Sequence, residues 1–328
     1  MTIFSPELFL IVRAVLPSFT IALLGFILGK LDTNRELNQK TISNVIYYFF
    51  TPCLVFSSLH RRSFDLQEFA VIGGAAVLLI AAMIPLAFYV KRRVKVAENG
   101  YCLPIIFMNT GNISLAIALL LFGNDGLSKS ILFHTVNIML LYSFGVFLVS
   151  GRTDMRQFLK IPALYATVLG IIVSTTTFSA PVVATQAFNI LNRGIDMIAL
   201  GTIPLLIVNL GYSISETKIT NTLKVGIPGA SMRIIVGPLL AFGLVFSFRA
   251  LGWIPVDPSM DPLVALGHRT TEGIIILNAA MPGPIMAYLL NVKFESCPEK
   301  AAAMLSIGTL AGIITIPIVL NFVTLLIR

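Results

Sequence analysis

The sequence predicts an all-α polytopic membrane protein with ten transmembrane helices, arranged as two inverted five-helix repeats. Three observations predict this class: the apolar composition, the length of the apolar segments, and matches between the two halves of the chain. Of the 328 residues, 56% are hydrophobic and only 12% are charged, whereas a soluble domain carries about 25% charged residues. This composition cannot cover a water-facing surface and therefore excludes a soluble protein.

Apolar segments follow one another along the whole chain, with short polar connections between them. A run of about 20 apolar residues crosses the roughly 30 Å hydrocarbon core of a bilayer. We therefore expect ten spans, which are numbered here in chain order: 7–29, 42–59, 69–90, 101–123, 130–150, 161–183, 195–215, 226–252, 268–291 and 301–327.

The basic residues near the span ends set the orientation. Of the 23 Lys and Arg, fourteen fall on one side and seven on the other, and Arg13 and Arg233 lie within spans. Excess Lys and Arg mark the cytoplasmic side, and the KRRVK run at 91–95 is its strongest anchor. We expect a multi-pass protein of the cell membrane with both termini outside. The net charge of +8 therefore indicates contact with membrane lipid and not with nucleic acid.

The two halves of the chain carry matched features in the same order. Span 1 has Pro17 followed eight residues later by Gly25, and span 6 has Pro162 and Gly170 at the same spacing. Spans 2 and 7 each contain a proline, and spans 4 and 9 each contain an asparagine in an irregular run. Because five is an odd number of spans, two such copies must have opposite orientations in the membrane, as in many secondary transporters.

Spans 4 and 9 should be interrupted. Span 9 contains the run Met-Pro-Gly-Pro at 281–284; its prolines remove two backbone donors and clash with the preceding turn. Span 4 contains Asn-Thr-Gly-Asn-Ile-Ser at 109–114, whose small and amide side chains can bond freed backbone groups. Irregular backbone at membrane depth is tolerated only where it is buried in protein or lines a cavity.

Interruptions at corresponding positions of two halves indicate a transport site near the bilayer midplane. Half-helix N-termini carry partial positive charge and free N–H groups, so they can hold a carboxylate without a basic side chain. Alternatively, the polar side chains only hydrogen-bond neighbouring helices and the prolines only kink them. The expected substrate-binding residues are Asn109, Gly111, Asn112, Ser114, Asn278, Met281, Pro282, Gly283 and Pro284.

Three ionisable residues in or near the spans are further candidates, because charges inside a membrane are costly. Arg233 in span 8 either snorkels to an interface or contacts the anion. His134 in span 5 is either an ordinary hydrogen-bonding residue or the carrier of a coupling proton. Glu272 in span 9 either pairs with Arg269 or caps its helix, or it couples transport to protons.

The interrupted spans also resemble a known family. NTGNISLAIALLLFG in span 4 resembles the fourth-span signature of the auxin efflux carrier family of permeases, and AAMPGPIMAYLL in span 9 resembles its ninth-span signature. The chain lacks the long central hydrophilic loop of many plant carriers and is similar to the short bacterial permeases. Family substrates are small organic anions, namely dicarboxylates such as malonate or malate in bacteria and indole-3-acetate in plants.

The resemblance covers all ten spans and implies a division of the chain. The repeats would be 1–150 and 151–328, with spans 4 and 9 crossing as broken helices. A scaffold of about 7–59 and 161–215 would form a homodimer, and a transport core of about 69–150 and 226–327 would hold the substrate.

One departure from the family concerns the span 4 signature, which often reads Asn-x-Gly-x-x-Gly-x-Pro. Asn109 and Gly111 match this pattern, whereas Ser114 and Ala116 replace the second glycine and the proline. We therefore expect a softer break in span 4.

These features predict a secondary transporter, a permease that moves a mono- or dicarboxylate by alternating access. The alternative is a sodium- or proton-coupled symporter or antiporter of the bile-acid-symporter type. No acidic pair lies at mid-span, which weakens the antiporter, and Asp196 is expected to pair with Arg193 at a helix end. The chain has no HExxH, GxSxG or P-loop motif, so we expect no enzyme, catalytic residue, metal or cofactor.

Overall fold

The computed structural model describes residues 6–32, 36–61, 66–151, 161–175, 186–216, 223–254 and 270–326. These residues are helical or lie in short connections, and none of them forms a β-strand. The all-α class predicted from the sequence is therefore confirmed for the described chain.

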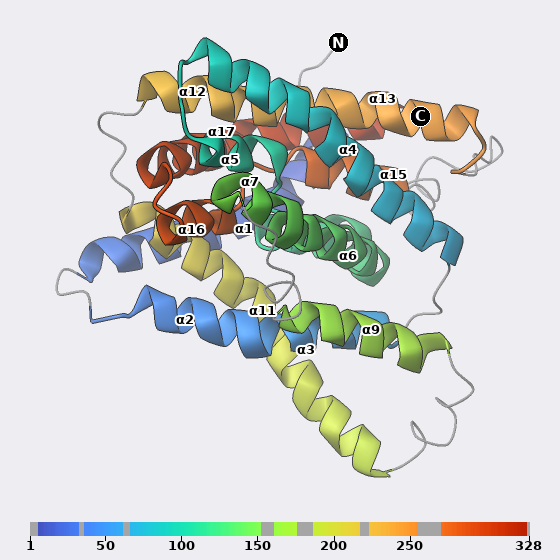
Figure 1. Cartoon of the computed structure of the whole chain (residues 1–328). Helices are drawn as coiled ribbons and strands as arrows, with labels where there is room; N and C mark the ends of the chain where they lie inside the picture. Colours follow the sequence, from blue (N-terminus) through green and yellow to red (C-terminus); the bar gives the residue numbers. More distant parts are fainter. Residues whose placement is uncertain are drawn as a thin grey trace.

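One group of helices lies together on one side of the molecule, at the bottom of Figure 1. A π-helical turn at Ile46–Phe50 joins α2 (Gln39–Val45) and α3 (Thr51–Leu59) into one continuous helix. Asn38 caps its start, because its side-chain oxygen accepts a hydrogen bond from the N–H of Thr41 (3.1 Å). The helices of this group are α2 (Gln39–Val45), α3 (Thr51–Leu59), α9 (Pro162–Thr175) and α11 (Gln186–Glu216).

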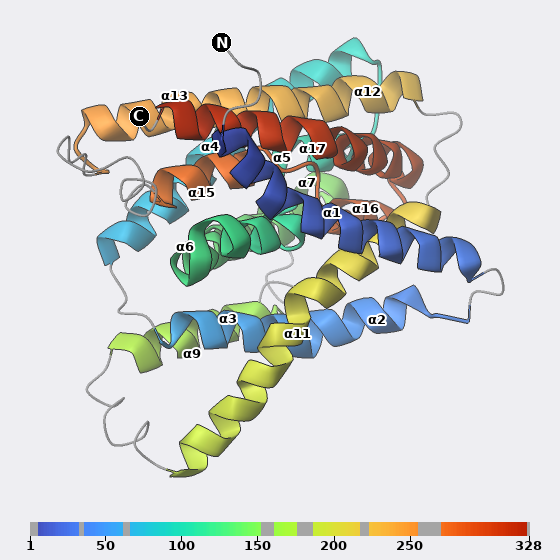
Figure 2. The ribbon, with the colours of Figure 1, turned by 180° about the vertical axis from the view of Figure 1, so that it is seen from behind.

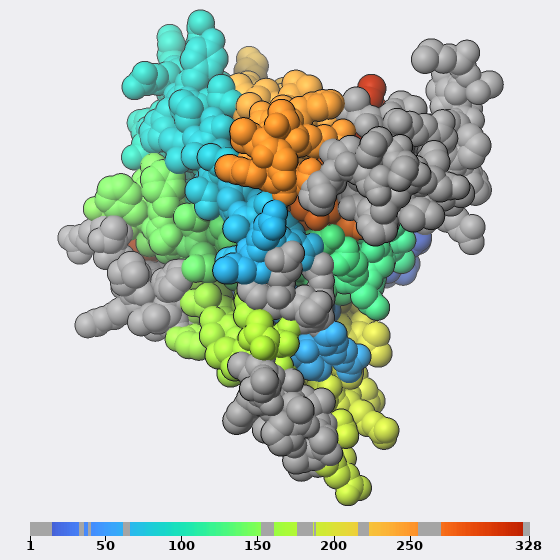
Figure 3. Space-filling view, turned by 90° about the vertical axis from the view of Figure 1, so that its right-hand side faces the viewer, coloured from blue at the N-terminus to red at the C-terminus, as the bar shows by residue number. Residues whose placement is uncertain are grey.

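A second, larger group lies opposite, with α4, α12 and α13 at its outer edge in Figure 1. Figure 3 shows the same division from another side, with α4 and α13 above and α9 and α11 below. The members of this group are α4 (Leu66–Arg93), α5 (Leu103–Ile106), α6 (Ile113–Leu140), α7 (Val146–Ser150), α12 (Leu223–Ser231), α13 (Gly237–Ala250), α15 (Thr270–Ala279), α16 (Ile285–Lys293) and α17 (Pro298–Leu326). A 3-10 turn at Asn99–Cys102 precedes α5, and π-helical turns at Leu141–Gly145 and Met232–Val236 join α6 to α7 and α12 to α13.

Helix α1 (Pro6–Leu31) lies across α11, as seen from behind in Figure 2. The two backbones are in direct contact: a Cβ on Gly25 would lie 2.1 Å from the carbonyl oxygen of Val208, and one on Gly211 only 1.9 Å from that of Ala22. Glycine at both positions is what allows this approach.

Six helical stretches of the described chain are long and apolar enough to cross a membrane. Two further apolar helices, Val15–Leu31 and Pro162–Thr175, are shorter, and predicted spans 4 and 9 are each split by non-helical backbone. The molecule is thus a multi-pass helical membrane protein, and the ten-span inverted repeat stays a prediction. The six stretches are Thr41–Leu59, Leu66–Arg93, Ile113–Ser150, Phe188–Ser215, Leu223–Ala250 and Pro298–Val323.

Helix α6 contains the predicted boundary between spans 4 and 5. Its range Ile113–Leu140 consists of two helices that meet at a kink at Gly123 (φ 66°, ψ −160°), where predicted span 4 ends, although the predicted connection at 124–129 is itself helical. Glycine adopts such a positive φ without a steric penalty. Helix α6 therefore combines the second half of predicted span 4 with most of span 5.

Candidate functional site

Both predicted helix interruptions are present. In span 4, residues 107–112 are non-helical between α5 and α6, and Phe107 is extended (φ −97°, ψ 157°). In span 9, residues 280–284 are non-helical between α15 and α16, and Pro284 is extended (φ −80°, ψ 148°). The first break begins two residues before the run at 109–114 that the sequence analysis singled out. It also ends two residues before the end of that run, so Ser114 belongs to α6.

The two breaks touch each other through their backbones. The N–H of Asn109 donates a hydrogen bond to the carbonyl oxygen of Pro282 (2.8 Å). A Cβ on Gly283 would lie 2.7 Å from the carbonyl oxygen of Pro104 in α5, so only glycine permits this approach. We call the two breaks and the adjoining helix ends the crossover.

Side chains of α6 replace the hydrogen bonds that the break in span 4 loses. The Asn137 amide donates to the carbonyl oxygen of Met108 (2.9 Å) and accepts from its N–H (3.4 Å). It also donates to the Thr110 hydroxyl (3.2 Å), which lies 2.8 Å from Nδ1 of His134. A Cβ on Gly111 would lie 2.8 Å from Cε1 of His134, so the ring packs directly against the break.

The sequence analysis singled out His134 but missed Asn137. Both are buried, and the His134 ring packs against the break in span 4. The available signal was an asparagine placed one helical turn after a histidine in an otherwise apolar helix, since residues three apart share a helix face.

Asn278 joins α15 to α6. Its Oδ1 accepts a hydrogen bond from the Ser114 hydroxyl (2.7 Å), and its Nδ2 donates to the hydroxyl of Ser130 (3.2 Å) and to the carbonyl oxygen of Ile274 (2.9 Å). Asn278, Ser114 and Ser130 are all fully buried. The Asn278 amide is therefore engaged within the protein and links neighbouring helices.

Asn109 and Asn112 differ from Asn278. Within the described chain, neither side-chain amide has a hydrogen-bond partner, although Asn109 is only 6% exposed. Asn112 directly precedes α6 but provides no capping hydrogen bond to it, and Pro284 provides none to α16. Met281 is fully buried in the second break.

Arg233 does not snorkel to an interface, because its side chain is 1% exposed. Its guanidinium donates to the carbonyl oxygen of Ala279 at the end of α15 (2.6 Å) and, at 3.4 Å, to those of Ile105 and Ile106 at the end of α5. The residue therefore contacts the crossover itself.

Glu272 and Asp196 each bind an arginine that the sequence analysis did not name. Glu272 is buried, and both of its oxygens accept hydrogen bonds from Arg249, one of them from Nε at 2.5 Å; the expected partner Arg269 lies outside the described residues. Asp196 binds Arg61 at the end of α3 and the hydroxyl of Ser57 (2.6 Å), and not Arg193 as expected. Both contacts bring together residues that are far apart in the sequence, which a pairing of residues one turn apart could not find.

A cavity of about 950 Å³ lies between α6 and the helices α1, α3 and α11. Its size suits a small-molecule ligand. Ala116, Leu119 and Leu120 line it on the α6 side, one to two turns after the start of that helix. None of the candidate residues predicted from the sequence lines this cavity. Its polar lining is Ser18, Ser57, Ser58, Arg61, Asn124, Asp125, Ser128 and Asp196.

The fold and this site together define a class of protein. Interrupted helices that meet inside a helical membrane protein, where irregular backbone is buried, are the architecture of membrane transporters.

Comparison with known proteins places the chain within that class. A family model described as membrane transport protein matches residues 10–158 and 147–320, so the chain belongs to this family, that of the auxin efflux carriers. The resemblance noted in spans 4 and 9 is thereby confirmed.

Curated relatives from archaea are similar over almost their whole length. An uncharacterized transporter of Methanothermobacter thermautotrophicus is 20% identical over 93% of this chain and 96% of its own. One of Methanocaldococcus jannaschii is 22% identical over 92% of this chain and 95% of its own. An uncharacterized transporter of Schizosaccharomyces pombe matches over a shorter stretch and is 33% identical over 33% of this chain and 25% of its own. The family and these relatives are transporters, which implies a small-molecule substrate.

Proposed function

We propose that this protein is a secondary transporter that moves a small organic anion, a mono- or dicarboxylate, by alternating access. The observation that carries the proposal is the pair of uncapped helix starts at the crossover, α6 after Asn112 and α16 after Pro284. The first N–H groups of a helix have no partner within it, and its N-terminus carries partial positive charge. Together with the unpartnered amide of Asn109, these groups offer the donors that a carboxylate needs.

The cavity supports a path for the substrate. It separates α6, in the predicted transport core, from α1, α3 and α11, in the predicted scaffold. A rigid movement of the core against the scaffold would expose the crossover to one side of the membrane and then to the other.

Equivalent helix contacts support the inverted repeat. Gly25 of span 1 packs against Val208 of span 7, and Gly170 of span 6 packs against Leu59 of span 2, where a Cβ would lie 3.0 Å from the Leu59 Cβ. The matched glycines thus each contact the second span of the opposite half. The placement in the cell membrane with both termini outside continues to rest on the distribution of Lys and Arg.

Transport by purified protein in lipid vesicles tests the proposal. Wild type should take up at least one of labelled acetate, malonate, malate and indole-3-acetate with saturable kinetics. Asn109→Ala and Asn112→Ala should each raise the KM about tenfold, the effect of one lost hydrogen bond to a charged group. The absence of saturable uptake of every carboxylate would contradict the proposal.

Asn209→Ala is the matched control. Its side chain lies in α11, where it donates to the Ser43 hydroxyl (3.2 Å), away from the crossover. Its KM should equal that of wild type. Asn278→Ala is unsuitable as a binding test, because it also removes the bonds to Ser114 and Ser130.

A further inference from the structure

Arg233 lies where two helices end. The last carbonyl groups of a helix have no partner within it, and Ile105, Ile106 and Ala279 are the last residues of α5 and α15. One guanidinium donates to all three of their carbonyl oxygens. Within the described residues, its hydrogen-bond partners are carbonyl oxygens alone, with no carboxylate among them.

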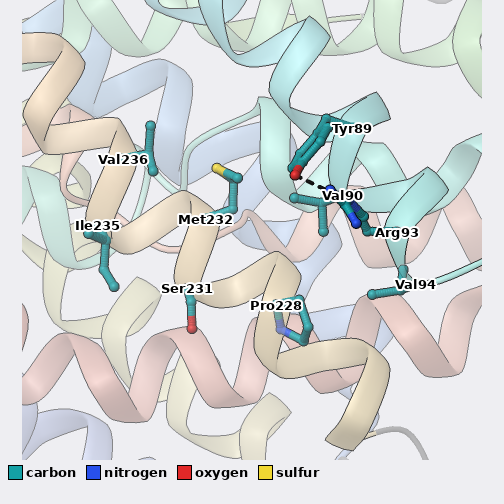
Figure 4. Close-up of a pocket in the computed structure, with 9 residues that line it drawn as sticks. All are labelled: Tyr89, Val90, Arg93, Val94, Pro228, Ser231, Met232, Ile235 and Val236. Carbon is teal, nitrogen blue, oxygen red and sulfur yellow. Dashed lines mark hydrogen bonds between the residues drawn. The ribbon is translucent and has the colours of Figure 1, made fainter.

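The neighbours of Arg233 show that its side chain points inward. Met232, Ile235 and Val236 line a shallow pocket of about 410 Å³ together with Tyr89 and Arg93 of α4 (Figure 4). Arg233 is not part of this pocket and is almost completely buried.

Gly237, one turn after Arg233, makes room for the guanidinium. A Cβ at this position would lie 2.0 Å from Nη2 of Arg233 and 2.7 Å from the carbonyl oxygen of Ala279. The absence of a side chain at Gly237 therefore leaves the space that the Arg233 guanidinium occupies.

Electrostatics gives the contact a consequence for the substrate. Each helix C-terminus is equivalent to about −0.5 elementary charge and each N-terminus to about +0.5. The carbonyl groups at the ends of α5 and α15 are both negative, and the positive charge of Arg233 offsets them. The starts of α6 and α16, in the same crossover, then remain as the positive helix ends.

We propose that Arg233 is a positioning residue: it fastens the C-terminal ends of α5 and α15 to each other and neutralises them, so that the crossover favours a negatively charged substrate. The first half of this statement concerns structure alone. The second half rests on the proposed function, because it concerns the anion that α6 and α16 would hold.

Hydrogen exchange and uptake of Arg233→Met and Arg233→Lys test the two halves separately. Without substrate, Arg233→Met should increase amide exchange in 103–109 and 276–282 about tenfold, the factor for one lost charge-assisted hydrogen bond. It should raise the KM for the carboxylate that wild type transports best, among malonate, malate and acetate, by a similar factor. The exchange rates and the KM of Arg233→Lys should lie between those of wild type and Arg233→Met, because lysine keeps the charge but lacks the planar guanidinium.

Met232→Ala is the matched control, since Met232 is the adjacent residue and faces the α4 pocket. It should leave exchange in both segments and the KM unchanged. If Arg233→Met does not fold, Gly237→Ala takes its place, because it retains the charge but occupies the space of the guanidinium; it should speed exchange in both segments.

Wild-type exchange in both segments for the folded Arg233 variants would overturn the proposal. Faster exchange with an unchanged KM would overturn its electrostatic half. Should wild type transport no carboxylate while the exchange effect is present, the proposed function fails and the structural role of Arg233 stands.

Discussion

The side-chain amide of Asn137 takes the place of a backbone peptide group at the break in span 4. Its amide both donates to and accepts from Met108, which is the pair of bonds that a neighbouring strand would make. An unpaired buried backbone group costs about 1–3 kcal/mol, so this side chain offsets part of the cost of interrupting a helix. The hydrogen bonds from α6 therefore stabilise one defined backbone conformation of the break.

Gly283 is a position in the crossover that has no room for a side chain. Gly283→Ala places a methyl group 2.7 Å from the backbone of α5, and such overpacking typically costs about 1–3 kcal/mol. We expect a lower thermal midpoint in detergent, and slower uptake because the breaks are forced apart.

Gly243→Ala provides the control for that substitution. Gly243 lies within α13, and a Cβ there has no neighbour within 4 Å in the described structure. Alanine is the better helix former by about 1 kcal/mol, so stability should be unchanged or slightly higher. Equal midpoints for the two variants would argue against the tight contact at Gly283.

At the scale of elements, polar side chains fasten the outer ends of the broken helices. Asn291 at the end of α16 donates to the carbonyl oxygen of Gly100 just before α5 (3.1 Å) and accepts from the N–H of Cys297 (3.2 Å). Lys300 at the start of α17 donates to both oxygens of Glu98 (3.0 and 2.9 Å). The two interrupted spans are thus held at their ends as well as at their crossing.

The Glu98–Lys300 pair predicts a small pH dependence of stability. Its hydrogen bond from Lys300 lowers the pKa of Glu98 below the ordinary value of 4.5. The stabilisation is therefore complete above about pH 4.5 and is lost as the pH falls through the depressed pKa. Both side chains are partly exposed (36% and 27%), so the pair contributes at most about 1 kcal/mol.

Glu98→Gln should remove that dependence. Thermal midpoints measured between pH 7 and pH 3 should fall less steeply for the variant than for wild type, and the two curves should converge at the acid end. Parallel curves would show that the ion pair contributes nothing to the folded state.

At the scale of the whole molecule, the cavity between α6 and the helices α1, α3 and α11 is the space in which the proposed movement occurs. Leu200→Trp adds volume to its lining, and Leu200 is 79% exposed, so the folded state should not suffer. We expect several-fold slower uptake in vesicles with an unchanged thermal midpoint.

Met197→Trp is the matched control for the cavity. Met197 lies on the same helix and is 75% exposed, but it does not line the cavity. Its uptake should match that of wild type. Equal rates for the two tryptophan variants would exclude the cavity from the transport path.

Local features of the sequence predicted the helical class and the position of both breaks. Apolar length, the prolines at 282 and 284 and the small and amide residues at 109–114 act through the nearest turns of the backbone, so no distant contact was needed to predict the class or the breaks. The partners of Arg233 could not be predicted in this way, because Ile105 lies 128 residues away in the chain. The cavity was missed for the same reason, since its lining comes from four separate helices.

The crossing of α1 and α11 has a mechanical consequence. Carbonyl oxygens of Ala22 and Val208 occupy the places where methyl groups would otherwise be. Any shift that replaces Gly25 or Gly211 at this contact by a residue with a side chain would place a Cβ against a carbonyl oxygen. Helices α1 and α11 therefore cannot slide along each other. We expect the conformational change of transport to occur at other helix contacts.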